Sequence, residues 1–261
     1  MGYSYDDVYK SSLKFFKGDE LATKIFVDKY ALHKDDDYYE LTPDDMWRRL
    51  ASSFARIESN YNKDDKPVYS EQDFYEALKD WKIIPGGSIL FGAGNPYAII
   101  SLSNCYAISS PKDTMSAIFD TARDIANLSK RRGGVGVCIS SLRPEGASVR
   151  NAAKTSSGAW SWGRFYSDAA QAVGQNSRRA ALLEGMHDWH PDIMQIIKMK
   201  QDLTAVNGAN ISVFVSDKFM RLVVDDPNAD WDLVYNGKAY KTVKVKEIWD
   251  LLVSCAHNTG E

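Results

Sequence analysis

Residues 99–146 read IISLSNCYAISSPKDTMSAIFDTARDIANLSKRRGGVGVCISSLRPEG, and this stretch decides the fold. Residues 99–108 mix β-branched and aromatic side chains, which predicts a strand. Apolar side chains at three- and four-residue spacing then predict an amphipathic helix over 114–129. The glycine pair at 133–134 allows a tight turn into a second strand over 135–139. The stretch is therefore a strand–helix–strand unit.

This unit brings a thiol and positive charge to neighbouring strand ends. Cys105 lies on the first predicted strand. Lys130, Arg131 and Arg132 close the helix, where cations suit the helix dipole. The glycine-rich turn that follows them leads straight into the second strand. The combination favours a site for an anionic substrate and for redox chemistry.

The rest of the chain divides into two parts by pattern. Residues 1–84 predict a helical domain, with a strong helix start at Thr42-Pro43. From residue 85 onward, predicted strands alternate with predicted helices, which indicates parallel βα units. The further strands are expected at 180–183 and 211–215, and the further helices at 161–173, 191–200 and 245–257. The fold class is therefore α/β after a helical N-terminal domain, with the boundary at 84/85.

Composition excludes several classes of protein. The chain has 261 residues, a formal net charge of −3 and three cysteines, Cys105, Cys138 and Cys255. So few cysteines argue against a disulfide framework and favour a reducing, cytoplasmic location. No apolar run is long enough for a membrane span, and the acidic balance argues against a general nucleic-acid binder.

Positive charge is concentrated in one part of the sequence. Residues 130–179 contain nine basic residues and only two acidic ones, Glu145 and Asp168. The nine are Lys130, Arg131, Arg132, Arg143, Arg150, Lys154, Arg164, Arg178 and Arg179. Two interpretations stay open from the residues alone. The segment is a solvated basic face, or it is a phosphate site built around glycine turns.

Seven motifs together resemble the large, catalytic subunit of ribonucleotide reductase. In chain order they are SNCY, KRRGGVGV, SLRPEG, TSSG, GQNSRRAA, HPDI and NISVFV. The resemblance implies a helical N-terminal domain over 1–84. It implies the first five-stranded half of a ten-stranded α/β barrel over 85–261.

The resemblance also implies the reaction, the conversion of ribonucleotides to deoxyribonucleotides by thiol and radical chemistry. The family's radical cysteine and finger loop have no counterpart in this sequence. We therefore expect the isolated chain to be inactive. Either a second chain supplies the other half of the barrel, or this sequence is a part of a longer protein. The alternative is a non-catalytic dNTP-binding regulatory or assembly subunit.

On this resemblance, four residues form the substrate site. Cys105 matches the thiol that reduces the substrate and ends in a disulfide. Ser88 and Asn104 match positions near the substrate phosphate and ribose, with Gly87 a rival to Ser88. Gly134 lets the backbone approach the substrate. From the residues alone, the alternative for Cys105 is a small buried hydrophobic residue, and the alternative for Ser88 is a turn residue.

The resemblance implies a second, allosteric nucleotide site. Asp113 matches the acid that holds the ribose of a dNTP effector, and Arg143 matches an arginine that meets its phosphates. The alternatives are helix capping for Asp113 and a solvent salt bridge for Arg143. A specificity loop over 174–181 would contain Gln175, Arg178 and Arg179, with Arg179 preferred over Arg178 as the residue that reports the effector. No metal site is expected.

Cofactor and partners are expected from the same resemblance. The PGGSILFGAG run resembles adenosylcobalamin-dependent (class II) enzymes more than typical class I enzymes, in which a separate metal-radical subunit supplies the radical. A thioredoxin or glutaredoxin would be the reductant, and a ribonucleoside di- or triphosphate the substrate. We expect a dimer of the completed catalytic unit, located in the cytoplasm, with no nucleic acid or membrane as partner.

Overall fold

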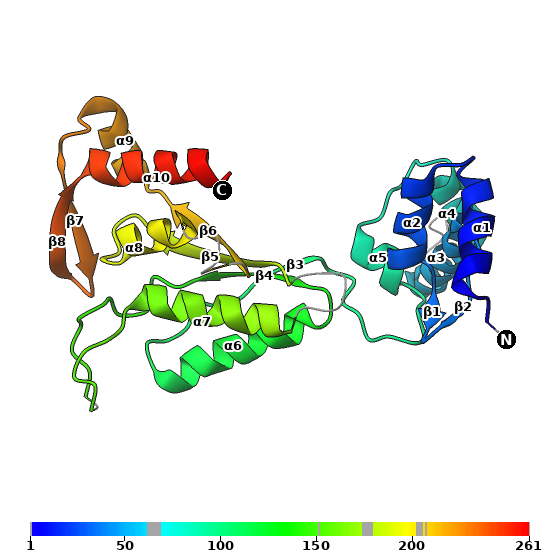
Figure 1. Ribbon diagram of the computed structural model, residues 1–261, viewed down its shortest axis with the longest axis horizontal. Coiled ribbons are helices and arrows are strands. Elements are labelled where there is room, and N and C mark those ends of the chain that lie inside the picture. The colour runs from blue at the N-terminus through cyan, green and yellow to red at the C-terminus, as the bar shows by residue number, and fades with distance from the viewer. Residues whose placement is uncertain are drawn as a thin grey trace. The chain divides into compact units, whose positions relative to one another are not determined.

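The computed structural model describes residues 2–61, 69–150, 152–173, 180–201, 206 and 208–260. The chain forms two compact units, Met1–Asn104 and Cys105–Glu261. Figure 1 shows the elements of both units.

The first unit is helical, as predicted. Its elements are α1 (Tyr5–Phe15), α2 (Glu20–Lys29), the short strands β1 (His33–Lys34) and β2 (Asp37–Tyr38), α3 (Pro43–Glu58), the 3-10 turn η1 (Ser59–Tyr61), α4 (Glu71–Lys79) and α5 (Gly87–Gly92). The predicted helix start is confirmed: Thr42 is the N-cap and Pro43 the first residue of α3. The Asp45 carboxylate accepts the Thr42 N–H at 3.0 Å and completes the cap.

A buried arginine ties α5 to the rest of this unit. Arg49 of α3 pairs with Glu40 at 2.6 Å, and both side chains are almost fully buried. The same guanidinium donates to the Leu90 and Ala93 carbonyls at the end of α5. The segment after residue 84 therefore packs with the helices. The division between units falls at 104/105, twenty residues beyond the boundary expected from the pattern.

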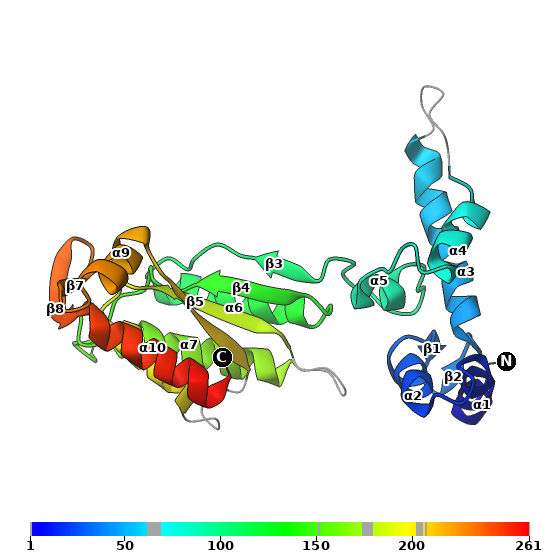
Figure 2. The ribbon, with the colours of Figure 1, turned by 90° about the horizontal axis from the view of Figure 1, so that it is seen from above.

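The second unit is built on a parallel sheet of four strands in sequence order. They are β3 (Cys105–Ala107), β4 (Gly134–Cys138), β5 (Leu182–His187) and β6 (Ala209–Phe214). Every neighbouring pair is parallel, which confirms the expected βα pattern. Four parallel strands lie within the described residues, where the resemblance implies five. Figure 2 shows β3, β4 and β5 following one another across the sheet.

The remaining elements of this unit are mostly helical. They are α6 (Met115–Ser129), α7 (Ala159–Ala172), α8 (Ile193–Lys198), the turn η2 (Met199–Gln201), α9 (Asp217–Asp225), the antiparallel hairpin of β7 (Asp230–Tyr235) and β8 (Lys238–Lys244), and α10 (Val245–Thr259). Within the described residues, no helix is both long and apolar enough to cross a membrane.

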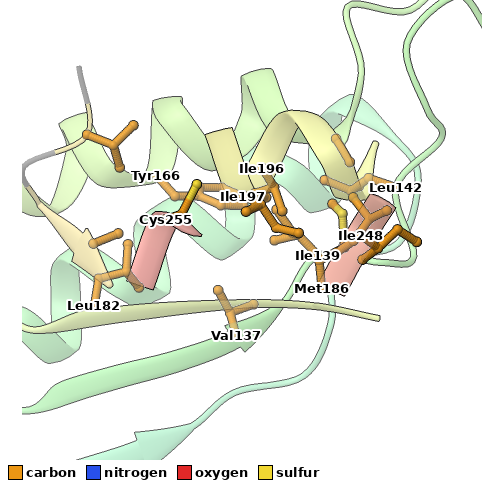
Figure 3. Close-up of a cluster of buried hydrophobic side chains, with 14 of the residues drawn as sticks. Val137, Ile139, Leu142, Tyr166, Leu182, Met186, Ile196, Ile197, Ile248 and Cys255 are labelled. Atoms are coloured by element: carbon orange, nitrogen blue, oxygen red, sulfur yellow. The ribbon is translucent and has the colours of Figure 1, made fainter. Parts of the chain in front are cut away.

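The core of the second unit lies between one face of the sheet and the helices. Val137 of β4 and Met186 of β5 are buried with Tyr166 of α7, Ile196 of α8 and Ile248 of α10. Figure 3 shows these side chains meeting in one cluster. Because side chains alternate along a strand, the residues on either side of Val137 in β4 and of Met186 in β5 point to the opposite face of the sheet.

That opposite face, here named the open face, carries Cys105, Gly134, Gly136, Leu183 and Phe214 by strand register. Cys105 is exposed, and Leu183 and Phe214 are 38% and 39% exposed. Small residues thus dominate the open face around the β3 and β4 strands.

The turn between α6 and β4 differs from the expected glycine turn. Arg132, with a φ of 69°, adopts the left-handed conformation, whereas Gly133 does not. Gly133 is needed for space, because a Cβ there would lie 2.8 Å from the ring of Tyr106. The glycine therefore lets the turn pack against β3.

Candidate functional site

The thiol expected to act on substrate lies at the start of β3. Cys105 is exposed and pairs in register with Gly134, the first residue of β4. Both positions belong to the open face, and Gly134 adds no side chain beside the sulfur. A thiol in this setting is accessible to a substrate and to a second thiol.

The other two cysteines have different surroundings. Cys138 lies four residues beyond Gly134 on β4, about 13 Å along the strand from the level of Cys105. That separation is too large for a disulfide with Cys105. Cys255 of α10 is buried, and its sulfur accepts from Gln201 Nε2 at 3.3 Å. Cys255 therefore serves the packing of this unit, whereas Cys138 is half-buried on the open face with its sulfur 3.5 Å from Ser140 Oγ.

The expected phosphate residues lie together in the first unit. Ser88 is in the first turn of α5 and fully buried, and its hydroxyl has no hydrogen-bond partner among the described residues. The Asn104 amide lies against the same turn, because a Cβ on Gly86 would be 2.5 Å from Asn104 Nδ2. Gly87, the rival to Ser88, lies beside the Tyr30 hydroxyl. The structure brings these residues together, while Cys105 and Gly134 belong to the second unit.

The two expected effector residues form an ion pair. Asp113 Oδ2 accepts from Arg143 Nε at 2.7 Å, and their side chains are 24% and 32% exposed. Helix α6 is capped by the next residue, since Thr114 Oγ1 accepts the Ala117 N–H. Asp113 is therefore not the cap, and its carboxylate is available at the surface next to Arg143.

Arg143 also contacts the loop that follows it. Its Nη1 donates to the Ser148 carbonyl at 3.0 Å. Guanidinium carries five N–H donors, so two or more remain for a ligand. The site thus combines an acid with an incompletely used arginine, a pairing that suits a nucleotide with a ribose and phosphates.

Tyr235, which the sequence did not indicate, completes this cluster. Its hydroxyl lies 3.1 Å from Asp113 Oδ2 and 3.0 Å from the Ser141 carbonyl oxygen. Desolvation and the nearby Asp113 charge raise the pKa of Tyr235 to about 12. The phenol therefore stays protonated and donates a hydrogen bond at neutral pH.

The loop after Arg143 is a small ribbon. The Gly146 N–H donates to the Ser156 carbonyl at 2.9 Å, and Ser148 and Thr155 form an antiparallel bridge. Figure 1 shows this segment extending between β4 and α7. The ribbon therefore begins two residues after Arg143 and ends at the start of α7.

Asp192 holds both ends of this ribbon. Its Oδ1 accepts the Glu145 N–H at 3.1 Å and its Oδ2 accepts the Ala159 N–H at 2.7 Å. Ala159 begins α7, whose N-cap Gly158 has no side chain to cap the helix. One buried carboxylate thus replaces the missing cap and closes the loop. Burial raises the pKa of Asp192, while these N–H groups and His190 act in the opposite direction.

His190 fixes the residue just before Arg143. The Asp192 N–H donates to His190 Nδ1, which places the ring proton on Nε2, and Nε2 donates to the Leu142 carbonyl at 2.9 Å. Burial lowers the pKa of His190, so the ring is neutral at pH 7. The HPDI motif thus provides structural support for the loop that carries Arg143.

The residues of the expected specificity loop are not placed. Gln175, Arg178 and Arg179 lie in 174–179, outside the described residues. Ala180 follows this gap and leads into β5, which begins two residues later.

A buried acid lies on the helix-facing side of β5. Neither carboxylate oxygen of Glu184 has a hydrogen-bond partner among the described residues. Desolvation raises the pKa of Glu184 well above its ordinary value, and the charge of Lys200 partly opposes this shift. Glu184 lies among core side chains rather than at the open face, so it is not part of the thiol site.

Metal ligands and a cavity for a cofactor were both sought among the described residues. No group of three or more His, Cys, Asp or Glu side chains there is arranged to hold a metal ion. The helical unit has a cavity of about 320 Å³ lined by apolar residues that include Phe26, Trp47 and Trp81. A cobalamin is much larger than this cavity, and the lining offers no cobalt ligand. The cavity therefore does not fit the cofactor.

Two family models match this chain. The model described as "Ribonucleotide reductase, barrel domain" matches residues 103–261. The model described as "Ribonucleotide reductase, all-alpha domain" matches residues 16–98. The first covers the whole parallel sheet with Cys105, and the second covers helices α2 to α5.

Curated relatives carry consistent names. The vitamin B12-dependent ribonucleoside-diphosphate reductase of Mycobacterium tuberculosis is 28% identical over 92% of this chain and 34% of its own length. Ribonucleoside-diphosphate reductase subunit alpha of Synechocystis is 27% identical over 80% of this chain and 28% of its own length. The large chain of Cryptosporidium parvum ribonucleoside-diphosphate reductase is 26% identical over 71% of this chain and 26% of its own length.

The chain therefore spans about a quarter to a third of the length of these relatives. The matched domains account for both structural units, the helical one and the one with the parallel sheet of an α/β barrel. The chain belongs to the large-subunit family of ribonucleotide reductases.

Proposed function

We propose that this chain is the N-terminal part of a ribonucleotide reductase and provides a reducing thiol for the conversion of ribonucleotides to deoxyribonucleotides. The observation that carries the proposal is the exposed Cys105 thiol beside Gly134 on the open face. The names of the relatives support the same reaction.

The reaction balances with two thiols. The C2′–O bond of the ribose breaks, a C2′–H bond forms, and the hydroxyl leaves as water. The two electrons come from Cys105 and a partner thiol, which join in a disulfide. A thioredoxin or glutaredoxin then reduces this disulfide. The partner thiol, the radical cysteine and the finger loop would come from the other half of the barrel, on a second chain or on a further part of the same protein.

Substrate binding would use the turn at the start of α5. The buried Ser88 hydroxyl lacks a partner among the described residues, and a phosphate oxygen would satisfy it. Asn104 and Gly134 would lie near the substrate, a ribonucleoside di- or triphosphate. We also propose that the helical domain ends at residue 84 and that the barrel domain begins at residue 85.

Control by a dNTP would act through Asp113 and Arg143. Asp113 would hold the effector's ribose and Arg143 its phosphates, and the ion pair between them supports a shared site. Arg179, with Arg178 and Gln175, would report the bound effector to the substrate base.

We also propose a cofactor and an oligomeric state for the completed enzyme. Adenosylcobalamin would supply the radical in a class II enzyme and would bind mainly outside the residues of this chain, while a separate metal-radical subunit is the alternative. Phe119 of α6 is exposed and packs against the half-buried Trp162 and Phe165 of α7, and this exposed ring supports a dimer. The assembly would be cytoplasmic.

A second candidate function is a non-catalytic dNTP-binding regulatory or assembly subunit. One observation favours it: Asp113 and Arg143 lie together within one unit, so both proposed effector contacts belong to this chain. Effector binding without turnover in the completed assembly would support this candidate.

The test is copurification and reconstitution with the chain that supplies the second half. We expect the isolated chain to be inactive and the pair to reduce ribonucleotides. In the pair, Cys105→Ser should abolish multiple turnover while dNTP affinity stays unchanged. Cys138→Ser is the matched control and should retain turnover. Full turnover by Cys105→Ser with thioredoxin as reductant would exclude the thiol role.

A further inference from the structure

The hairpin of β7 and β8 reaches a nucleotide site that lies far from it in the sequence. Tyr235, the last residue of β7, is 122 residues from Asp113 and 94 residues from Ser141. Its hydroxyl lies within hydrogen-bond distance of the Asp113 carboxylate and the Ser141 carbonyl. The hairpin therefore adds a donor to a site otherwise made from the segment just before α6 and the Arg143 loop.

The two oxygens of Asp113 are used unequally. Oδ2 faces both the Arg143 Nε at 2.7 Å and the Tyr235 hydroxyl at 3.1 Å. Oδ1 has no hydrogen-bond partner among the described residues, and the side chain is 24% exposed. Two donors on one oxygen fix the plane of the carboxylate and leave the other oxygen for a ligand.

We propose that Tyr235 is a positioning residue for nucleotide binding: it holds Asp113 Oδ2 so that Oδ1 meets the ribose hydroxyl of the effector. This inference rests on the proposed dNTP site. A deoxyribose in a nucleoside triphosphate has one hydroxyl, at the 3′ carbon, so that group is the expected partner of Oδ1.

The ring of Tyr235 is itself held in place. Its centroid lies 6.0 Å from that of His190, with the rings at 75° to each other. His190 in turn is buried and bound to the Leu142 carbonyl. Because the ring is packed against a fixed neighbour, Tyr235→Phe should keep the packing and remove only the hydroxyl.

The experiment pairs a change in the protein with a change in the ligand. Calorimetry measures the affinity of the full chain for dTTP and for 2′,3′-dideoxythymidine triphosphate, which lacks the 3′-hydroxyl. Wild type should bind dTTP more tightly. Tyr235→Phe should lose about tenfold in dTTP affinity, close to the lower end of the range for a hydrogen bond to a charged group, and keep its affinity for the dideoxy compound. The preference for the 3′-hydroxyl should therefore disappear.

The matched control is Tyr240→Phe, an exposed tyrosine on β8 of the same hairpin, which should behave as wild type. If Tyr235→Phe keeps the wild-type preference, or loses affinity for both ligands equally, the positioning role is overturned while the dNTP site stands. If wild type binds neither ligand, or binds both equally, the proposed effector role of Asp113 fails, and the inference fails with it.

Discussion

Replacing Asp192 with asparagine should loosen both ends of the ribbon that follows Arg143. The carboxylate accepts the Glu145 N–H through Oδ1 and the Ala159 N–H through Oδ2. An asparagine keeps one oxygen and presents an NH2 group at the other position. One backbone N–H would then face another donor instead of an acceptor.

The expected loss follows from these contacts. A hydrogen bond to a charged group is worth about 1.5–3 kcal/mol, and a helix cap about 1 kcal/mol. Burial raises the pKa of Asp192, so the native charge carries a desolvation cost that asparagine does not have. We therefore expect the free energy of unfolding of the second unit to fall by about 2 kcal/mol, near the lower part of that range.

Hydrogen exchange read by mass spectrometry at increasing urea measures this loss peptide by peptide, separately for each unit. Peptides across 145–159 should also exchange faster in native buffer. Asp168→Asn is the matched control, because Asp168 is an exposed acid on the same helix, α7. Equal unfolding free energies for the two variants, or unchanged exchange at 145–159, would refute the reasoning.

Three further predictions concern Glu184, Arg143 and Arg179. The folded-state pKa of Glu184 is raised, so between its ordinary pKa and the folded value the native chain binds more protons than the unfolded chain, and stability falls as pH rises. Urea midpoints from pH 5 to 8 should therefore fall less steeply for Glu184→Gln than for wild type, and parallel profiles would contradict this. Arg143→Ala should weaken dNTP binding by roughly tenfold or more in calorimetry, whereas Arg179→Ala in the reconstituted enzyme should keep most effector affinity and lose the dependence of base choice on the effector. Normal dNTP binding by Arg143→Ala, or wild-type switching by Arg179→Ala, would show that the residue has another role.

Local pattern predicted the fold well where each element's own residues determine it. The Thr42-Pro43 helix start and the parallel strand order follow from capping residues and alternation of strands and helices. The strand expected over 99–108 is only Cys105–Ala107. Ahead of it, the Ser103 N–H binds the Ser101 hydroxyl, a local turn that competes with a strand ladder.

The site was predictable only in part, for a physical reason. Cys105 and the Asp113–Arg143 pair were indicated by motifs or charge in neighbouring segments. Tyr235 and Asp192 act on residues 122 and 47 positions away, respectively, and nothing in their local sequence marks these contacts. Only the folded chain brings the hairpin and the HPDI segment to the Arg143 loop.

The Arg49–Glu40 pair links the affinity for substrate to residues of the helical unit. Arg49 fixes the end of α5, and α5 carries Ser88 in its first turn. If Ser88 holds the substrate phosphate as proposed, the helical unit positions the group that binds the phosphate, and the sheet positions the reducing thiol. Substitutions in α3, which contributes no reacting atom, would then change KM while leaving the chemistry at Cys105 intact.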